Sequence, residues 1–298
     1  MTTASVPTGM RPQQDAPRKA AQNREKWASV RTYISAAVIL IWCLAPAYWM
    51  VVTAFREVGF TYDTTPWPTH ITLDNFITAF DTSFGNKFGQ ALLNSIIIGV
   101  TVTVVSLVIG VFAAYALARL NFRFKYLVLG FILGASMFPG VALITPLFQL
   151  FTNIGWMGTY QALIIPNISF VLPLTVYTLT SFFREMPWEL EESARVDGCT
   201  QGQAFRKVIM PLAAPAIFTT AILAFISSWN EFLIASQLSN EATQPVTVAI
   251  ASFAGAQPNQ IPYTAIMAAG TIVTIPLVIL VLVFQRKIVA GLTAGAVK

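Results

Sequence analysis

Six long apolar runs, separated by short polar segments, constrain this chain of 298 residues more than any other feature. Each run is about as long as the roughly 20 residues that a helix needs to cross a lipid bilayer, and is too uninterrupted for a soluble helix. Charged residues supply only 10% of the chain, against about 25% in an ordinary globular domain. The pattern therefore predicts an all-α integral membrane protein with six transmembrane helices. The predicted spans are residues 33–55, 91–118, 126–150, 160–183, 212–234 and 263–284.

The segment before the first run, residues 1–32, is rich in proline, glutamine and basic side chains. It cannot bury a core, so it is predicted to be a disordered tail. It contains no short apolar stretch with a small-residue cleavage site, so we expect the first run to be a retained anchor. The six-span domain is predicted at 33–288, with its core at 90–285, and a C-terminal tail at 289–298.

Lysine and arginine predict how the spans are oriented. With the N-terminus in the cytoplasm and the sides alternating, all 18 of these residues except Arg56 and Lys87 fall on the cytoplasmic side. Such an excess is the signature of cytoplasmic loops. We therefore expect a multi-pass protein of the cell (inner or plasma) membrane, in contact with membrane lipid, with both termini in the cytoplasm. This topology explains the excess of basic over acidic residues, so no nucleic-acid partner is expected.

Few residues could support metal chemistry or catalysis. Cys43 lies in the first run and Cys199 in a polar connector, and their different depths argue against a disulfide or a metal site. His70 is the only histidine. We expect neither a metal site nor a catalytic residue. The chain also lacks the G-x-x-x-x-G-K-[ST] phosphate loop, so it cannot bind ATP by that device.

Transport is the function that the spans favour, but several mechanisms stay open at this point. Prolines lie inside the runs, where they kink helices and can help to enclose a cavity. An ion-coupled secondary transporter needs titratable groups deep in its spans, and only Glu231, near the end of the fifth, is available. A channel needs a filter, and none is visible. A structural scaffold would leave the longest cytoplasmic connector unexplained.

That connector, residues 184–211, is predicted to form two short helices. Met186-Pro187-Trp188-Glu189 is a good helix start, because proline suits the first turn and acidic residues suit the positive end of the helix dipole. Glu191 and Arg195 are spaced as an i,i+4 ion pair. Gly198 stands where a helix end requires a left-handed residue.

The second helix is predicted to begin at Thr200, because Gln203 follows at the spacing of a capping box. It is expected to end before Pro211, where the fifth span begins. A short, capped cytoplasmic helix held by two spans suits the transmission of motion from a soluble partner. A connector that only caps the spans is the alternative.

The connector also carries a recognisable motif. Glu192-Ser193-Ala194, three residues, Gly198, nine residues, then Val208-Ile209-Met210-Pro211 resembles the E-A-A-x3-G-x9-I-x-L-P loop of ABC-importer permeases. The substitutions of Ser for Ala, Val for Ile and Met for Leu keep size or apolarity. Further segments are similar to the shorter sugar permease of maltose- and trehalose-type importers: Thr72-Leu73-Asp74-Asn75-Phe76, Asn94-Ser95, Trp229-Asn230-Glu231-Phe232 and the ending Gly291–Lys298.

The resemblance implies a type I ABC importer permease, a non-catalytic subunit with an EAA-type coupling hairpin. Its expected partners are a second, homologous permease, two copies of an ABC ATPase, and an extracytoplasmic sugar-binding protein or lipoprotein. ATP and Mg²⁺ would be bound by the ATPases, and no cofactor by this chain. The expected substrate is a di- or oligosaccharide such as trehalose or maltose. Glycerol phosphate and monosaccharides are the alternatives.

The resemblance also implies roles for named residues. The ATPase-coupling residues would be Glu191, Glu192, Ser193, Ala194, Asp197 and Gly198, and the C-terminal tail would add Gly291, Leu292, Thr293 and Gly295. The loop toward the binding protein would have its tip at Gln257, Pro258, Asn259 and Gln260, where a plain turn is the alternative. Candidate sugar contacts are Asn94, Asn167, Ser228, Trp229, Asn230 and Glu231. Bonds between helices explain such polar groups equally well.

Overall fold

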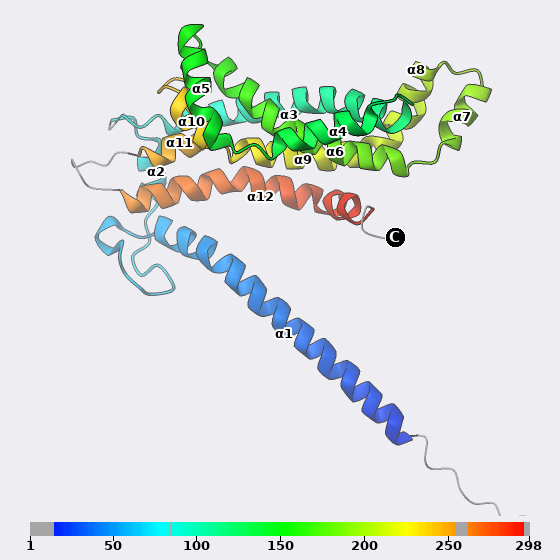
Figure 1. Cartoon of the computed structure of the whole chain (residues 1–298). Helices are drawn as coiled ribbons and strands as arrows, with labels where there is room; N and C mark the ends of the chain where they lie inside the picture. Colours follow the sequence, from blue (N-terminus) through cyan, green and yellow to red (C-terminus); the bar gives the residue numbers. More distant parts are fainter. Residues whose placement is uncertain (1–14, 84, 254–261, 295–298) are drawn as a thin grey trace, which may run out of the picture. The chain divides into compact units, whose positions relative to one another are not determined.

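The structure is a computed structural model that describes residues 15–83, 85–253 and 262–294, with side chains from 27 to 285 within those ranges. The chain divides into two compact units, residues 1–52 and 53–298. The described residues are almost entirely helical, and no named strand occurs among them (Figure 1).

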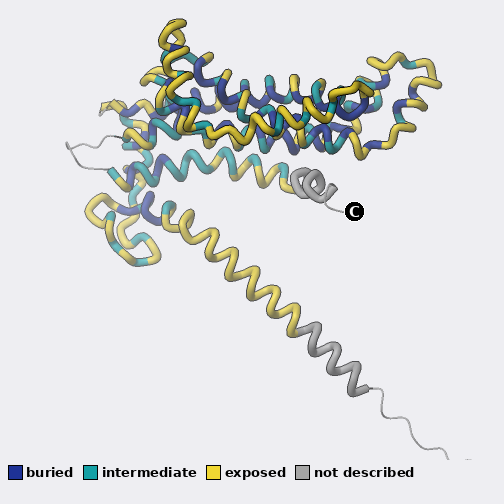
Figure 2. Tube along the Cα trace, viewed as in Figure 1, coloured by how far each residue is buried: buried dark blue, intermediate teal, exposed yellow. Residues whose placement is uncertain are grey.

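The first unit consists of the helix α1, Asp15–Ala54, which continues by two residues into the second unit. Its apolar part, Trp27–Ala54, is 28 residues long and is exposed over residues 27–49, as Figure 2 shows. The predicted disordered tail at 1–32 is wrong for residues 15–32, which are helical. Alanine, lysine, arginine, glutamine and glutamate dominate residues 18–26. All are good helix formers, and they extend a helix that the apolar segment has already nucleated.

The second unit contains four long helices and several shorter ones. The long helices are α3 (Phe88–Arg119), α6 (Tyr160–Glu185), α9 (Met210–Trp229) and α12 (Tyr263–Ala294). The shorter ones are η1 (Val58–Phe60), α2 (Asp74–Phe80), α4 (Lys125–Ser136), α5 (Gly140–Asn153), α7 (Glu189–Val196), α8 (Gln201–Ala204), η2 (Phe205–Ile209), α10 (Leu233–Leu238) and α11 (Val246–Ala251). The hairpin α7–α8 lies at the opposite end of this unit from α2, α10 and α11 (Figure 1).

The third apolar run is not one straight span, as the sequence predicted, but two helices. α4 and α5 meet at an angle of 86°, and Pro139 is the extended residue between them. A proline disfavours helix in the residue before it and cannot donate a helical hydrogen bond. The described residues thus contain five helices long and apolar enough to cross a membrane, or six spans if the bent pair counts as one.

The core of the second unit lies where α3 packs against α6 and α9, and Figure 2 shows buried residues along these helices. Small residues bring the helices together. A Cβ atom added at Gly110 would lie 2.6 Å from Thr175 Cγ2 of α6, and one at Gly99 would lie 2.9 Å from Phe225 Cε2 of α9. Close backbone approach at small residues is how membrane helices gain packing contacts.

One further boundary differs from the predictions. The fifth run was expected to span 212–234, but α9 ends at Trp229 and the last residues of the run enter α10. Arg56, which was predicted to lie in an external loop, follows the end of α1 in a loop where its side chain is fully buried. Its guanidinium donates hydrogen bonds to the carbonyls of Asp63 and Thr65. The buried cation therefore organises its own loop.

Candidate functional site

The first helix of the hairpin ends as the sequence predicted. Gly198 has φ of +89°, a conformation that costs a glycine little and other residues more. At this turn the amide of Cys199 donates to the carbonyl of Ala194 at 2.9 Å, and the amide of Gly198 donates to the carbonyl of Arg195 at 3.1 Å. The two bonds satisfy carbonyls that the end of α7 would otherwise leave open.

The predicted capping box at the second helix is confirmed. The amide of Gln203 donates to Thr200 Oγ1 at 3.4 Å, and the amide of Thr200 donates to Gln203 Oε1 at 2.9 Å. The expected helix end before Pro211 is wrong, because the chain is helical from Gln201 to Trp229. The π-helical turn Phe205–Ile209 precedes the proline, and such a turn shifts the hydrogen-bond register that a proline would otherwise break.

The hairpin presents part of the motif to solvent and buries the rest. Glu192, Ser193, Asp197 and Gly198 are exposed, whereas Ala194 is buried. An open hollow runs along this surface, lined by Glu192, Arg195, Val196, Cys199, Thr200 and Gln201. The exposed residues form a polar surface that a soluble partner could contact.

Glu191 is the exception among the predicted coupling residues. Its side chain is only 6% exposed, and Oε1 accepts a hydrogen bond of 2.8 Å from the hydroxyl of Tyr115 on α3. The predicted ion pair with Arg195 is therefore wrong, whereas a contact of Glu191 with a partner's basic groups stays a prediction. The helix α7 packs against η2 and α8, and Tyr115 reaches Glu191 from the end of α3, so the carboxylate finds its partner within the chain.

Arg119, at the end of α3, contacts the start of the same hairpin. Its Nη2 donates to the carbonyl of Met186 at 2.9 Å, and its guanidinium lies 4.6 Å from the ring centroid of Trp188. The sequence reasoning missed both Tyr115 and Arg119. Their i,i+4 spacing was a usable signal, but tyrosine and arginine at a span end are also ordinary interface anchors.

The candidate sugar contact Asn94 is engaged within the chain. It is fully buried, and its Nδ2 donates to the carbonyls of Ala242 and Gln244 at 2.9 and 3.0 Å. Its Oδ1 accepts from the hydroxyl of Tyr160 at 2.7 Å and from Gln90 at 3.0 Å. These four bonds satisfy the amide completely and tie α3 to α6 and to the loop before α11.

An ion pair lies beside this amide. Lys87 Nζ lies 2.9 Å from Glu241 Oε2, with both side chains exposed. The hydrogen bond and the positive charge of the lysine lower the pKa of the Glu241 carboxyl. Both contacts hold the loop of residues 239–245 against the start of α3.

Three other candidates are also engaged within the chain. Asn167 donates to Ser228 Oγ at 3.0 Å in a buried bond between α6 and α9. Glu231 accepts from the amides of Ile234 and Ala235 at 2.8 and 3.0 Å and so caps α10. These three side chains line a cavity of about 10 Å³, which is room for one water molecule rather than a sugar.

The remaining candidates are accounted for as follows. Trp229 is 2% exposed and packs against Phe225, so its ring offers no stacking surface in this conformation. Asn230 is exposed, and its amide bonds to Ile226 O at 2.8 Å. Of the six candidates, Asn230 is exposed and Glu231 is half-buried, whereas the other four are buried.

Two predicted contact segments are described only in part. The tip Gln257, Pro258, Asn259 and Gln260 lies outside the described residues, as does Gly295. The backbone at Gly291, Leu292 and Thr293 is helical within α12. The predicted tail at 289–298 therefore begins within α12, because the preceding span has already nucleated the helix.

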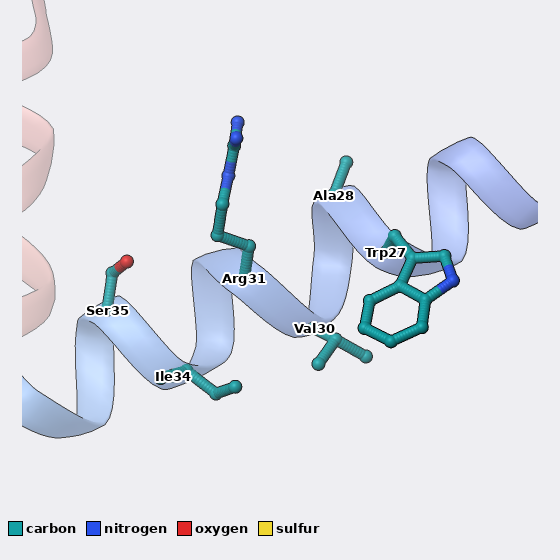
Figure 3. A pocket seen from close by; sticks show the side chains of 6 residues that line it. All are labelled: Trp27, Ala28, Val30, Arg31, Ile34 and Ser35. Carbon is teal, nitrogen blue, oxygen red and sulfur yellow. The ribbon is translucent and has the colours of Figure 1, made fainter.

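A hollow along α1 is lined by Trp27, Ala28, Val30, Arg31, Ile34 and Ser35. Figure 3 shows that these side chains come from one helix and point in different directions. They converge on no common point, so the hollow lacks the few convergent polar groups of a ligand site. Among the residues that the structure describes, no group of three His, Cys, Asp or Glu side chains could hold a metal ion.

The chain was compared with known families and structures. A model of the family "Binding-protein-dependent transport system inner membrane component" matches residues 106–293. The trehalose transport system permease protein SugB of Mycobacterium tuberculosis is 44% identical, over 93% of this chain and 99% of that protein. The trehalose/maltose transport system permease protein MalG of Thermococcus litoralis is 40% identical, over 89% and 95%.

A crystal structure of a bacterial ABC transporter involved in the import of the acidic polysaccharide alginate has a similar fold. Its TM-score is 0.73 at 21% identity, and the match covers 88% of this chain and 97% of that chain. This likeness supports the helical fold described above. The chain therefore belongs to the binding-protein-dependent transport system inner membrane components, the multi-pass membrane permeases of ABC importers.

Proposed function

We propose that this chain is the permease subunit of an ATP-driven importer whose substrate is a di- or oligosaccharide of the trehalose or maltose type. The sugar class is supported by the two relatives at 44% and 40% identity, both named as permeases for such sugars. The role in coupling is supported by one geometric observation. The helix α7, fixed at its end by the left-handed Gly198, presents Glu192 and Asp197 to solvent.

The same proposal extends to the partners. The exposed motif residues of α7 would seat in one of two cytoplasmic ATPase subunits, which bind ATP and Mg²⁺, while this chain binds no cofactor and is not catalytic. A second, homologous permease would complete the pathway. An extracytoplasmic binding protein would deliver the sugar to the end that bears α2, α10 and α11. Residues 257–260 and 291–295 stay proposed contacts with the binding protein and with the ATPases, respectively.

The test is reconstitution of the complete importer in liposomes with its loaded binding protein. We expect ATP-dependent uptake of trehalose or maltose, and little uptake of glucose or glycerol 3-phosphate by the same complex. Uptake driven by an ion gradient without ATP would refute the mechanism. Uptake of glycerol 3-phosphate or a monosaccharide in preference to every disaccharide tested would refute the substrate class and leave the mechanism standing.

The orientation is tested by labelling single cysteines in intact cells, after Cys43 and Cys199 are changed to serine. Lys87→Cys, at the start of α3, should react with an impermeant maleimide from outside. Lys125→Cys, at the start of α4, should react only after the membrane is opened. Both termini then lie in the cytoplasm. The reverse labelling pattern would invert the topology.

A further inference from the structure

The last turns of α3 carry two side chains that hold the coupling hairpin. We propose that Tyr115 and Arg119 are positioning residues that lock α7 to α3, so that a displacement of α7 by its partner moves α3 with it. This inference rests on the proposed coupling role of α7. It assigns a function to two side chains of α3 that contact the hairpin within this chain.

Tyr115 contacts three elements of the hairpin region at once. Its hydroxyl donates to Glu191 Oε1 of α7 at 2.8 Å. Its ring centroid lies 4.5 Å from that of Phe205 in η2 and 6.0 Å from that of Phe183 at the end of α6. A hydrogen bond to a carboxylate is stronger than one between neutral groups, and here it lies at the edge of an aromatic cluster. The hydroxyl therefore fixes which face of α7 turns toward α3.

Arg119 fixes the point where α6 gives way to α7. Met186 is extended and ends α6, so its carbonyl lies outside the helical hydrogen-bond pattern. Arg119 is only 5% exposed, donates to that carbonyl at 2.9 Å and stacks over Trp188. Tyr115 and Arg119 are four residues apart and therefore lie on one face of α3. Together they contact both the entry to α7 and its first turn.

The surrounding core makes these contacts a mechanical link. Val111 and Ala114 of α3 belong to one buried cluster with Phe183 of α6 and Ile209, which enters α9. The hairpin therefore contacts the packed ends of three spans and is not held by its two connections alone. Packed interiors resist continuous deformation and move as units. Removing the hydroxyl of Tyr115 should loosen this unit without removing its apolar packing.

The experiment compares Tyr115→Phe, Glu191→Gln and the double variant in the reconstituted importer. Sugar transported and ATP hydrolysed are measured together, and hydrogen exchange is followed at residues 189–197. We expect each single variant to lower sugar transported per ATP at least threefold and to speed exchange in α7. Because both changes weaken the same bond, the double variant should be no worse than the more affected single variant.

Tyr177→Phe and Glu185→Gln are the matched controls, since both side chains are exposed on α6. Their ratio of sugar to ATP should equal that of the original protein. The proposal is overturned if both single variants keep the original ratio, or if exchange in α7 rises while the ratio stays unchanged, which indicates a structural role only. The proposal is also overturned if the fold-losses of sugar transported per ATP in the two single variants multiply in the double variant.

The outcomes separate this proposal from the proposed function. If the original complex shows no ATP-dependent sugar uptake, the proposed function fails, and the ratio of sugar to ATP has no meaning. Hydrogen exchange in α7 still decides whether the lock exists, because it needs no substrate. Arg119→Lys is a second variant that keeps the charge but loses the planar stacking on Trp188. It should also speed exchange in α7, and unchanged exchange in both Arg119→Lys and Tyr115→Phe would refute the lock.

Discussion

Replacing Asn94 by alanine should destabilise the end of the second unit that lies opposite the hairpin (Figure 1), although the sequence suggested a sugar contact. The change removes four hydrogen bonds from a fully buried amide. A hydrogen bond between membrane helices contributes on average about 0.6 kcal/mol, so four of them contribute about 2–2.5 kcal/mol. The carbonyls of Ala242 and Gln244 would also lose their donor, but Ala242 is exposed and Gln244 is only half-buried, so water can replace it. We therefore expect a loss of about 2–2.5 kcal/mol.

The assay is thermal unfolding of the detergent-purified complex, followed by transport in liposomes at a temperature where the variant is folded. Asn230→Ala is the matched control, because Asn230 is exposed and makes one bond within its own helix. That change should shift stability by less than about 0.5 kcal/mol, as for most surface substitutions. Asn94→Ala should lower the melting temperature clearly.

Two results would refute the reasoning. A melting temperature equal to that of the original protein would mean that the four bonds contribute nothing to folding. Unchanged stability together with lost uptake would restore Asn94 as a sugar contact. Asn94→Asp refines the test, since it keeps an acceptor for Tyr160 but places negative charge against the carbonyls that the amide now serves. It should be at least as destabilising as alanine.

The remaining predictions concern glycines. Gly110→Ala should cost about 1–3 kcal/mol of stability by overpacking, because its Cβ would lie 2.6 Å from Thr175 Cγ2. Gly130→Ala is the control and should leave the melting temperature unchanged, because nothing lies within 4 Å of its added Cβ. Equal effects of the two changes would contradict the close approach of α3 to α6. Gly198→Val should lower the free energy of unfolding by at least about 1–2 kcal/mol, because valine must adopt the left-handed backbone that Gly198 has at φ of +89°. It should also lower sugar uptake at normal expression. Normal uptake would show that coupling does not need this turn.

The sequence predicted the elements whose causes are local. Apolar runs give the spans, and the capping pattern at Thr200 and the turn at Gly198 depend on residues within four positions of one another. These signals carry their own geometry. The break at Pro139 was also visible as a proline. Its 86° angle was not predictable, because membrane helices often contain prolines that only kink them.

The side-chain roles were harder to predict because they depend on distant partners. Glu191 looked like an exposed half of an ion pair, and its burial follows from Tyr115, 76 residues earlier in the chain. Asn94 looked like a pathway residue, and its partners at 242 and 244 lie about 150 positions away. A polar residue in an apolar run signals that a partner exists. It does not say whether that partner is a substrate or the protein itself.

The two polar anchors of α3 lead to a last prediction. Asn94 and Tyr115 are 21 residues apart in one helix, which corresponds to about 32 Å at about 1.5 Å per residue. At that separation their effects on stability should add within about 0.5 kcal/mol. If α3 transmits motion as a rigid element, however, loss of either anchor interrupts the same path.

In the double variant Asn94→Ala/Tyr115→Phe, the losses in the free energy of unfolding should therefore add, whereas the losses of coupling should not. Its loss of sugar transported per ATP should match that of the more affected single variant, because a path already broken at one end gains nothing from a second break. Both quantities are measured on the same reconstituted complexes. Multiplicative losses of coupling would show that the two ends act independently, and α3 would then not be the element that connects the hairpin to the loop before α11.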